Sequence, residues 1–124
     1  DAPTGESCVA RRDVSNTPLQ ALTLLNDVFF VEVSQAMGKM LAAREGSVEA
    51  RIREAFRRCL TRPPSDEEVA ALVKFFAAQK LRFVRGDLDA KLIAGDGPGD
   101  VTERAAWTTL ARALLNLDEM ITKS

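Results

Sequence analysis

The residues that carry most enzyme chemistry are unevenly represented in this chain. It contains no His and no Tyr, which removes the commonest general base and the commonest transition-metal ligand. A Ser-His-Asp triad and covalent haem attachment through a C-x-x-C-H motif therefore cannot be built from these residues alone. Catalysis would have to use carboxylates, lysine, arginine or groups supplied from elsewhere. We expect no catalytic, cofactor-binding or metal-binding site within the chain.

The only two thiols are Cys8 and Cys59. A disulfide between them is chemically allowed in an exported protein. Cys59, however, lies on the apolar face of a predicted helix beside Leu60, where a thiol packs well as a small hydrophobic group. We favour the packed thiol over the bridge, and thiol catalysis least, because the chain supplies no histidine to act as its base.

Arginines gather in and around residues 47–62: Arg44, Arg51, Arg53, Arg57, Arg58 and Arg62. Such a strip would suit phosphate groups of a nucleic acid. Glutamates are interleaved with the arginines, and three pairs fall at helical pair spacing: Glu49–Arg53, Glu54–Arg57 and Glu54–Arg58. No aromatic residues alternate with them, as a single-strand binder would need. We therefore favour a solvated, self-compensated face over a nucleic-acid interface.

Four aspartates lie close together in sequence before the last predicted helix: Asp87, Asp89, Asp96 and Asp100. Calcium prefers oxygen ligands of this kind. Their spacing does not match an EF-hand loop, and Asp-Gly pairs are ordinary turn chemistry. We favour turns and helix starts over a calcium site.

Several polar residues stand beside strongly apolar segments: Arg11, Arg12, Asn16, Gln20, Asn26 and Asn116. Side chains of this type tie lead-in segments to helix ends through backbone hydrogen bonds. The alternative is a contact surface for a neighbouring domain, and we name these residues as its candidates. The structural role is the favoured one.

The hydrophobic pattern places these residues on helices. After an extended lead-in over residues 1–16, Thr17, Pro18 and Gln20 predict a helix start. Asn26-Asp27 offers a second cap, so we expect a short helix turning into a longer one that stops near Gly46.

Ser47 is expected to open the third helix, which the proline pair after Arg62 should end. Ser65 to Glu68 forms the clearest capping box, and the fourth helix it begins should fade near Gly86. Residues 17–85 thus hold four helices.

Residues 86–100 contain four of the seven glycines and are predicted to form one long loop, with a single helical turn over 88–93. Asp100 should open the last helix, residues 101–122, whose apolar stripe includes Trp107 and Leu114. We therefore predict an all-α fold: one domain, 1–124, in a compact bundle of about five helices with a long Gly/Asp-rich loop before the last.

Composition agrees with a folded domain, since 46% of residues are hydrophobic and 28% are charged. The net charge of −1 gives no overall field for nucleic acid or an anionic membrane, and no apolar run is long enough to span a bilayer. We expect neither a nucleic-acid partner nor a membrane span. The chain begins at Asp1 and shows no signal peptide, and we expect it to be part of a larger protein.

Some sequence blocks are specific enough to indicate a family. They are Cys8–Arg12, Ser15–Leu22, Leu24–Asp27, Phe56-Arg57, Leu60–Pro64 and, near the end, Trp107 with Leu110–Arg112 and Leu114–Glu119. These blocks resemble the C-terminal part of a planctomycete-specific domain of unknown function, found at the C-terminal end of large planctomycete proteins that often carry a cytochrome-c-like domain. Val28 stands where the family usually has proline, and Cys59 where it usually has an ordinary apolar residue.

The resemblance implies an exported, multi-domain parent, located in the periplasm or at the cell surface, with any haem in another domain. It also suggests polysaccharide use, because sulfatase-like genes often lie nearby. We expect a non-catalytic structural or interaction module whose partners are other domains of the same parent or an exported protein. The alternative is an accessory part of a glycan-related enzyme whose site is completed by upstream residues. Nucleic-acid binding is the least favoured reading.

Overall fold

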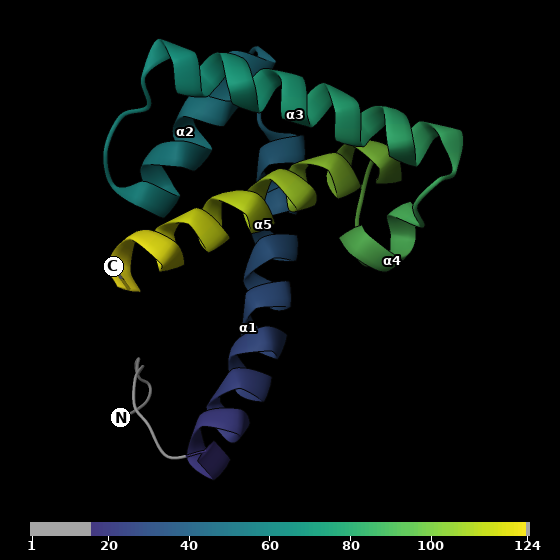
Figure 1. The fold of residues 1–124 in the computed structure, drawn as a ribbon. Helices are drawn as coiled ribbons and strands as arrows, with labels where there is room; N and C mark the ends of the chain where they lie inside the picture. The colour runs from purple at the N-terminus through teal and green to yellow at the C-terminus, as the bar shows by residue number, and fades with distance from the viewer. Residues whose placement is uncertain (1–15, 124) are drawn as a thin grey trace. The chain divides into compact units, whose positions relative to one another are not determined.

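The computed structural model describes the backbone of residues 16–123 and the side chains of residues 27–117. Within these residues the chain is helical and has no strand, which confirms the predicted all-α bundle (Figure 1). The five helices are α1 (Asn16–Ala43), α2 (Val48–Leu60), α3 (Asp66–Arg85), α4 (Ala90–Ala94) and α5 (Val101–Lys123). The extended lead-in predicted before α1 lies outside the described residues, apart from Asn16, which is already helical.

The chain forms two compact units, residues 1–32 and residues 33–124. The division falls inside α1, so this helix contributes residues to both. The larger unit contains the end of α1 and all of the other four helices.

The prediction of two helices over residues 17–45 is wrong, because α1 is continuous from Asn16 to Ala43. Asn26 and Asp27 can cap a helix, but inside one they are less favourable than alanine by only about 0.7 kcal/mol each. No proline or glycine interrupts the helix there, and strongly apolar residues lie on both sides. The predicted stop at Gly46 is close to the observed end, and Gly46 has a positive φ of 114°.

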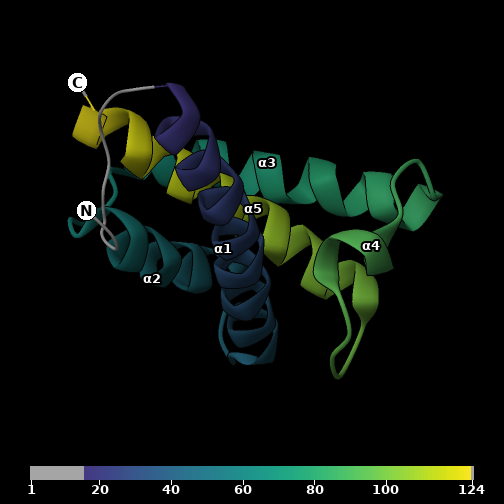
Figure 2. The same ribbon diagram turned by 90° about the horizontal axis from the view of Figure 1, so that it is seen from below.

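Helix α5 is the centre of the larger unit. Helices α2, α3 and α4 all pack against it, and α2 also contacts α3. Both ribbon views show α3 running alongside α5, with α4 beside the first turns of α5 (Figures 1 and 2). The helix with the longest buried stripe thus has neighbours on several sides, which explains why its small residues Ala105, Ala106 and Ala111 are fully buried.

Trp107 is the largest fully buried side chain of the core. Its ring centroid lies 4.2 Å from that of Phe76 on α3, with the planes tilted by 38°. The two rings are therefore in direct contact within the core. The other large members of this core are Leu41, Ile52, Phe56, Leu60, Phe83, Leu110 and Leu114.

Helix ends follow local chemistry closely. Ser47 caps α2 by accepting a hydrogen bond from the Ala50 amide, as predicted. The end of α2 differs from the prediction, because the helix stops at Leu60, before the proline pair, where Thr61 adopts a left-handed conformation with φ 56°. The Thr61 amide still donates to the Arg57 carbonyl, so the helix ends in a bonded cap.

Candidate interaction surface

Of the six polar residues predicted to form a contact surface, only Asn116 has a described side chain. Arg11 and Arg12 lie outside the described residues, as do the side chains of Asn16, Gln20 and Asn26, although these last three belong to α1. Asn116 is exposed on α5. Their common role remains a prediction.

The arginines of α2 are largely engaged in ion pairs and contacts. Arg58 pairs with Glu54 one turn earlier, as predicted, at 3.1 Å, and Arg44 approaches the same carboxylate at 2.6 Å. Arg53 pairs with Asp66, the first residue of α3, at 3.1 Å rather than with Glu49. These contacts link α2 to its neighbours. The guanidinium groups of Arg53 and Arg58 are therefore already paired with carboxylates, whereas a nucleic-acid interface would need them to bind phosphates.

Arg51 has a different environment from the other arginines of α2. Its guanidinium carbon lies 5.0 Å from the centroid of the Trp107 ring. Its Nη1 donates to the Leu41 carbonyl at 3.3 Å, and its Nε lies 3.5 Å from the Ser47 carbonyl. The side chain therefore ties the turn between α1 and α2 to the core. Its cation faces the negative face of an aromatic ring.

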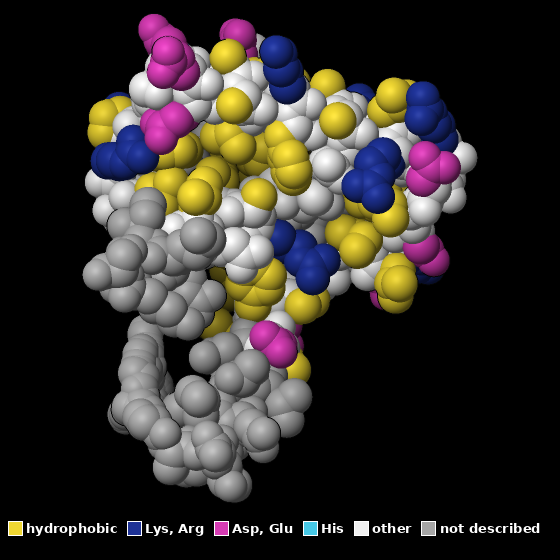
Figure 3. Space-filling view, in the orientation of Figure 1, with side chains coloured by type: hydrophobic (Ala, Val, Ile, Leu, Met, Phe, Trp, Pro, Cys, Tyr) yellow, Lys and Arg dark blue, Asp and Glu magenta, His cyan; other side chains and the backbone are white. Residues whose placement is uncertain are grey.

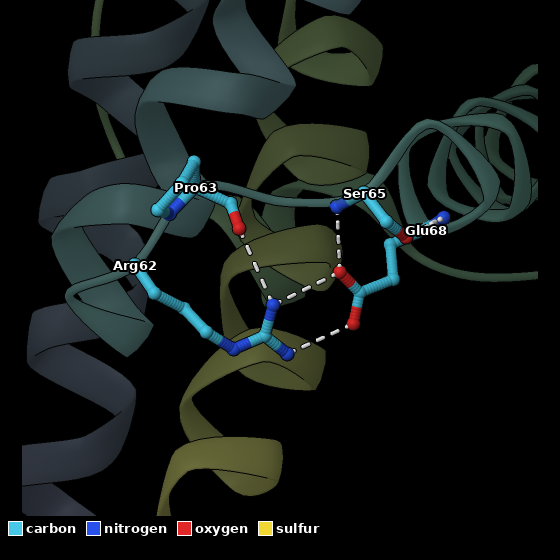
Figure 4. Close-up of polar contacts among 4 residues, drawn as sticks. All are labelled: Arg62, Pro63, Ser65 and Glu68. Atoms are coloured by element: carbon cyan, nitrogen blue, oxygen red, sulfur yellow. Dashed lines mark hydrogen bonds and ion pairs between the residues drawn. The ribbon is translucent and has the colours of Figure 1, made fainter.

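The turn between α2 and α3 is held by Arg62 and Glu68 (Figure 4). Arg62 donates to both carboxylate oxygens of Glu68, at 3.1 and 2.9 Å, and to the Pro63 carbonyl at 3.3 Å. The Ser65 amide donates to Glu68 Oε1 at 2.8 Å, while the Glu68 amide donates to Ser65 Oγ at 3.1 Å. The capping box predicted from the sequence is thus confirmed, with an arginine added to it.

The same contacts set the pKa values of both ionised groups. Hydrogen bonds from Arg62, and then from the Ser65 amide, lower the pKa of Glu68 to about 2. The reciprocal hydrogen bond raises the pKa of Arg62. Among the described residues, the carboxylate whose pKa is lowered most therefore lies at a helix start, where it is held as an anion and is unsuited to accept a proton near neutral pH.

Two of the four aspartates in the Gly/Asp-rich segment before α5 lie at helix starts. Asp89 accepts a hydrogen bond from the Leu92 amide at the start of α4, which lies close to the predicted helical turn. Asp100 accepts from the hydroxyl and the amide of Thr102, and these bonds lower its pKa. Asp96 lies 3.6 Å from Lys91. Among the described side chains, no three His, Cys, Asp or Glu residues form a group suited to a metal ion.

Arg104 of α5 holds this segment through hydrogen bonds to its backbone and is almost completely buried. Its Nε donates to the Pro98 carbonyl at 2.7 Å, and its Nη1 donates to the Gly95 carbonyl at 2.9 Å. Nothing in the sequence pattern distinguished this arginine, because the partners are backbone carbonyls in a loop. It is a structural tie that sequence reasoning missed.

Cys59 is buried, as its place beside Leu60 predicted. Its sulfur lies 3.6 Å from the sulfur of Met37. Cys8 lies outside the described residues, so the less favoured alternative, a bridge between the two cysteines, is not tested.

Exposed apolar side chains remain on α1, within the smaller unit. Val28 is 59% exposed, Phe29 is 66% exposed, and Val31 is also exposed. The signal was present in the sequence as four consecutive apolar residues, 28–31. Because helix residues advance by about 100° each, such a run cannot be buried by one face. Large exposed apolar groups of this kind mark interaction surfaces.

A second exposed apolar face lies on α3, in the larger unit. Leu81 and Val84 are 48% and 62% exposed. Figure 3 shows apolar and basic side chains next to one another over this helix. Lys74 and Arg85 are exposed there and have no carboxylate partner among the described residues.

The chain belongs to the family described as Protein of unknown function (DUF1553), whose model matches residues 1–76. This confirms the resemblance at the level of a domain of unknown function. The match ends inside α3, at Phe76, so the blocks around Trp107 and Leu114 that also suggested the family lie beyond it. No curated protein and no solved structure matches the chain. None of the helices in the described residues is both long and apolar enough to cross a membrane.

Proposed function

We propose that this chain is a non-catalytic helical interaction module of a longer, exported planctomycete protein, whose other domains it contacts. The observation that carries the proposal is the apolar segment of α1 at residues 28–31, which is exposed on several sides. A haem, where the parent has one, belongs to another domain in this proposal. The exported setting rests on the family resemblance.

The physical argument begins with the helix wheel. Residues 28, 29, 30 and 31 point in four directions about 100° apart. A helix that is apolar all round is typically buried within a larger protein. Residues 28–31 therefore have the character of a buried helix while most of their side chains are exposed.

The ionisable groups in the described residues also support a non-catalytic role. The two carboxylates with lowered pKa, Glu68 and Asp100, start helices α3 and α5. A general acid or base requires a pKa close to the working pH, and both shifts move away from neutrality. Both carboxylates accept backbone hydrogen bonds at the start of a helix.

Nucleic-acid binding has less support than protein contact. A phosphate-binding strip needs arginines that are free to neutralise phosphates. In α2, Arg53 and Arg58 are paired with carboxylates, and Arg51 lies against Trp107. An apolar surface is what other protein domains recognise.

The proposal can be tested by placing a benzophenone amino acid at position 29 of the longer protein and irradiating it. We expect cross-links from this position to a defined peptide of the same protein, mapped by mass spectrometry. The matched control carries the benzophenone at position 49, because Glu49 is exposed on α2 and has no ion-pair partner among the described residues. Equal, scattered cross-linking from both positions would show that residue 29 faces solvent, and the proposal would be wrong.

A further inference from the structure

Two exposed apolar faces of this chain carry opposite charges. The first, called the α1 segment, consists of Asp27, Val28, Phe29, Val31 and Glu32, all exposed. The second, called the α3 face, consists of Lys74, Leu81, Arg82, Val84 and Arg85, all exposed. Each combines large apolar side chains with charges of one sign.

The charge separation extends well beyond these residues. Between residues 14 and 38 the only charged side chains are Asp27 and Glu32, and both are acidic. Between residues 69 and 86 every charged side chain is basic: Lys74, Lys80, Arg82 and Arg85. Lys80 is paired with Glu103, which leaves the other three bases to the α3 face.

The helical geometry groups the members of the α3 face and, on the α1 segment, Asp27, Val28, Val31 and Glu32, whereas Phe29 lies about 160° around the helix from Val31. On α3, Leu81 lies one turn from Val84 and Arg85 and two turns from Lys74, so the apolar groups have bases on the same side. On α1, Asp27 and Val31 are one turn apart, as are Val28 and Glu32. Charges therefore flank the apolar groups on both faces, as in the polar rim of a protein interface.

Pairing of like faces is unfavourable. An antiparallel pair of α1 segments centred between Phe29 and Phe30 would set Asp27 of one copy opposite Glu32 of the other. A pair of α3 faces would bring together Lys74, Arg82 and Arg85 from both copies. Like charges across an interface are costly, whereas a positive patch meeting a negative patch is favoured.

We propose that the α1 segment of one copy of this chain binds the α3 face of a second copy. The inference rests on the proposed function as an interaction module and names a partner for it. Val28 and Val31 supply apolar contact with Leu81 and Val84. Asp27 and Glu32 lie against the basic rim. Because the two surfaces differ, each copy can use both, and association continues beyond a pair unless the contacts close on themselves.

Charge reversal provides the test. We would measure molar mass against protein concentration by light scattering at low ionic strength, where surface charges are least screened. The unmodified chain is expected to self-associate. Two double variants are each expected to weaken association by about tenfold or more. One reverses the α1 segment, Asp27→Lys/Glu32→Lys, and the other reverses the α3 face, Arg82→Glu/Arg85→Glu. The matched control, Glu49→Lys/Arg57→Glu, changes exposed charges on α2 and should leave association unchanged.

Restoration is the decisive result. Mixing the two charge-reversed variants, or combining all four substitutions in one chain, pairs a basic α1 segment with an acidic α3 face and should restore association. A carbodiimide that joins carboxylates to amines should also couple Asp27 or Glu32 to Lys74. In a mixture of isotopically light and heavy copies, the coupled peptides should include light–heavy pairs.

The proposal would be overturned if the chain were a monomer at every concentration, or if charge reversal left its association unchanged. It would also be overturned if the mixture of variants did not restore association, or if coupling were confined to light–light and heavy–heavy pairs. These results are separable from the proposed function, since cross-links from position 29 to another domain of the longer protein would still support an interaction module. Circular dichroism of each variant shows whether the helices are intact, and a variant that unfolds is replaced by Asp27→Asn/Glu32→Gln, which removes charge without reversing it.

Discussion

Gly38 of α1 packs directly against Thr108 of α5. A Cβ atom placed on Gly38 would lie 2.1 Å from Thr108 Oγ1 and 2.8 Å from both the backbone nitrogen and Cα of Thr108. These distances are shorter than any real Cβ contact, and two of them involve backbone that cannot rotate away. The absence of a side chain at Gly38 therefore permits the two helices to touch.

Gly38→Ala should destabilise the larger unit. In an isolated helix this change is favourable by about 1 kcal/mol, but here overpacking should lower the free energy of unfolding by about 3 kcal/mol. Thermal and denaturant unfolding measure the difference. Thr108→Ala should not rescue the variant fully, because the Thr108 backbone remains in contact. A Gly38→Ala protein as stable as the parent would show that the two helices lie further apart than described. Ala36→Gly, at an exposed position on the same helix, calibrates the helix-propensity contribution.

Arg51→Met should weaken the core around the only tryptophan. The change removes the cation beside the Trp107 ring and the hydrogen bond to the Leu41 carbonyl, and we expect a loss of about 1–2 kcal/mol. Fluorescence offers a second readout, since all tryptophan emission comes from Trp107. Arg57→Met is the matched control, because Arg57 is exposed and its change should stay within about 0.5 kcal/mol. Equal effects of the two substitutions would contradict the assigned role of Arg51.

Glu68 should make stability depend on pH in the acid range. Its pKa is about 2 in the folded chain, below the ordinary value of 4.5. A lowered folded pKa stabilises the fold above the unfolded pKa, and this contribution is lost as pH falls from the ordinary value toward about 2. As pH is lowered across that range, the free energy of unfolding should therefore fall more steeply for the unmodified chain than for Glu68→Gln. Parallel pH profiles would mean that Glu68 is not held by Arg62 in solution.

Ser65→Ala tests the other half of the same capping box. Removing the hydroxyl that accepts the Glu68 amide should lower the free energy of unfolding by about 1 kcal/mol. Ser65→Asp, which keeps an acceptor at the helix start, should recover most of this loss at neutral pH. Urea titrations of the three proteins give the values, and an Ala variant that is no less stable than the parent would refute the cap.

Arg104→Lys should loosen the segment between α4 and α5. A lysine ammonium cannot reproduce the fork that bonds the Pro98 and Gly95 carbonyls together. We expect a loss of about 1.5–3 kcal/mol, the range for hydrogen bonds to charged groups. The rate of amide hydrogen exchange should rise most within residues 95–99. Arg57→Lys serves as the surface control, and an unchanged exchange pattern in Arg104→Lys would count against the tie.

The sequence by itself determined the all-α class and the helix starts at Ser47, Ser65 and Asp100. These features depend on residues within three positions of one another, so their hydrogen bonds can be read from spacing. The burial of Trp107 and Cys59 also followed from helical periodicity. The exposed run at 28–31 was visible in the sequence, although its exposure was not.

The tertiary structure decided which of several locally acceptable arrangements occurs. Asn26-Asp27 could cap a helix or continue one, and the small difference in propensity does not choose between them. Arg53 had Glu49 at favourable spacing but pairs with Asp66, which only the packing of α2 against α3 brings near. The roles of Arg104 and Gly38 depend on backbone atoms distant in sequence. Local spacing specifies contacts along one helix, whereas contacts between helices exist only after the chain has packed.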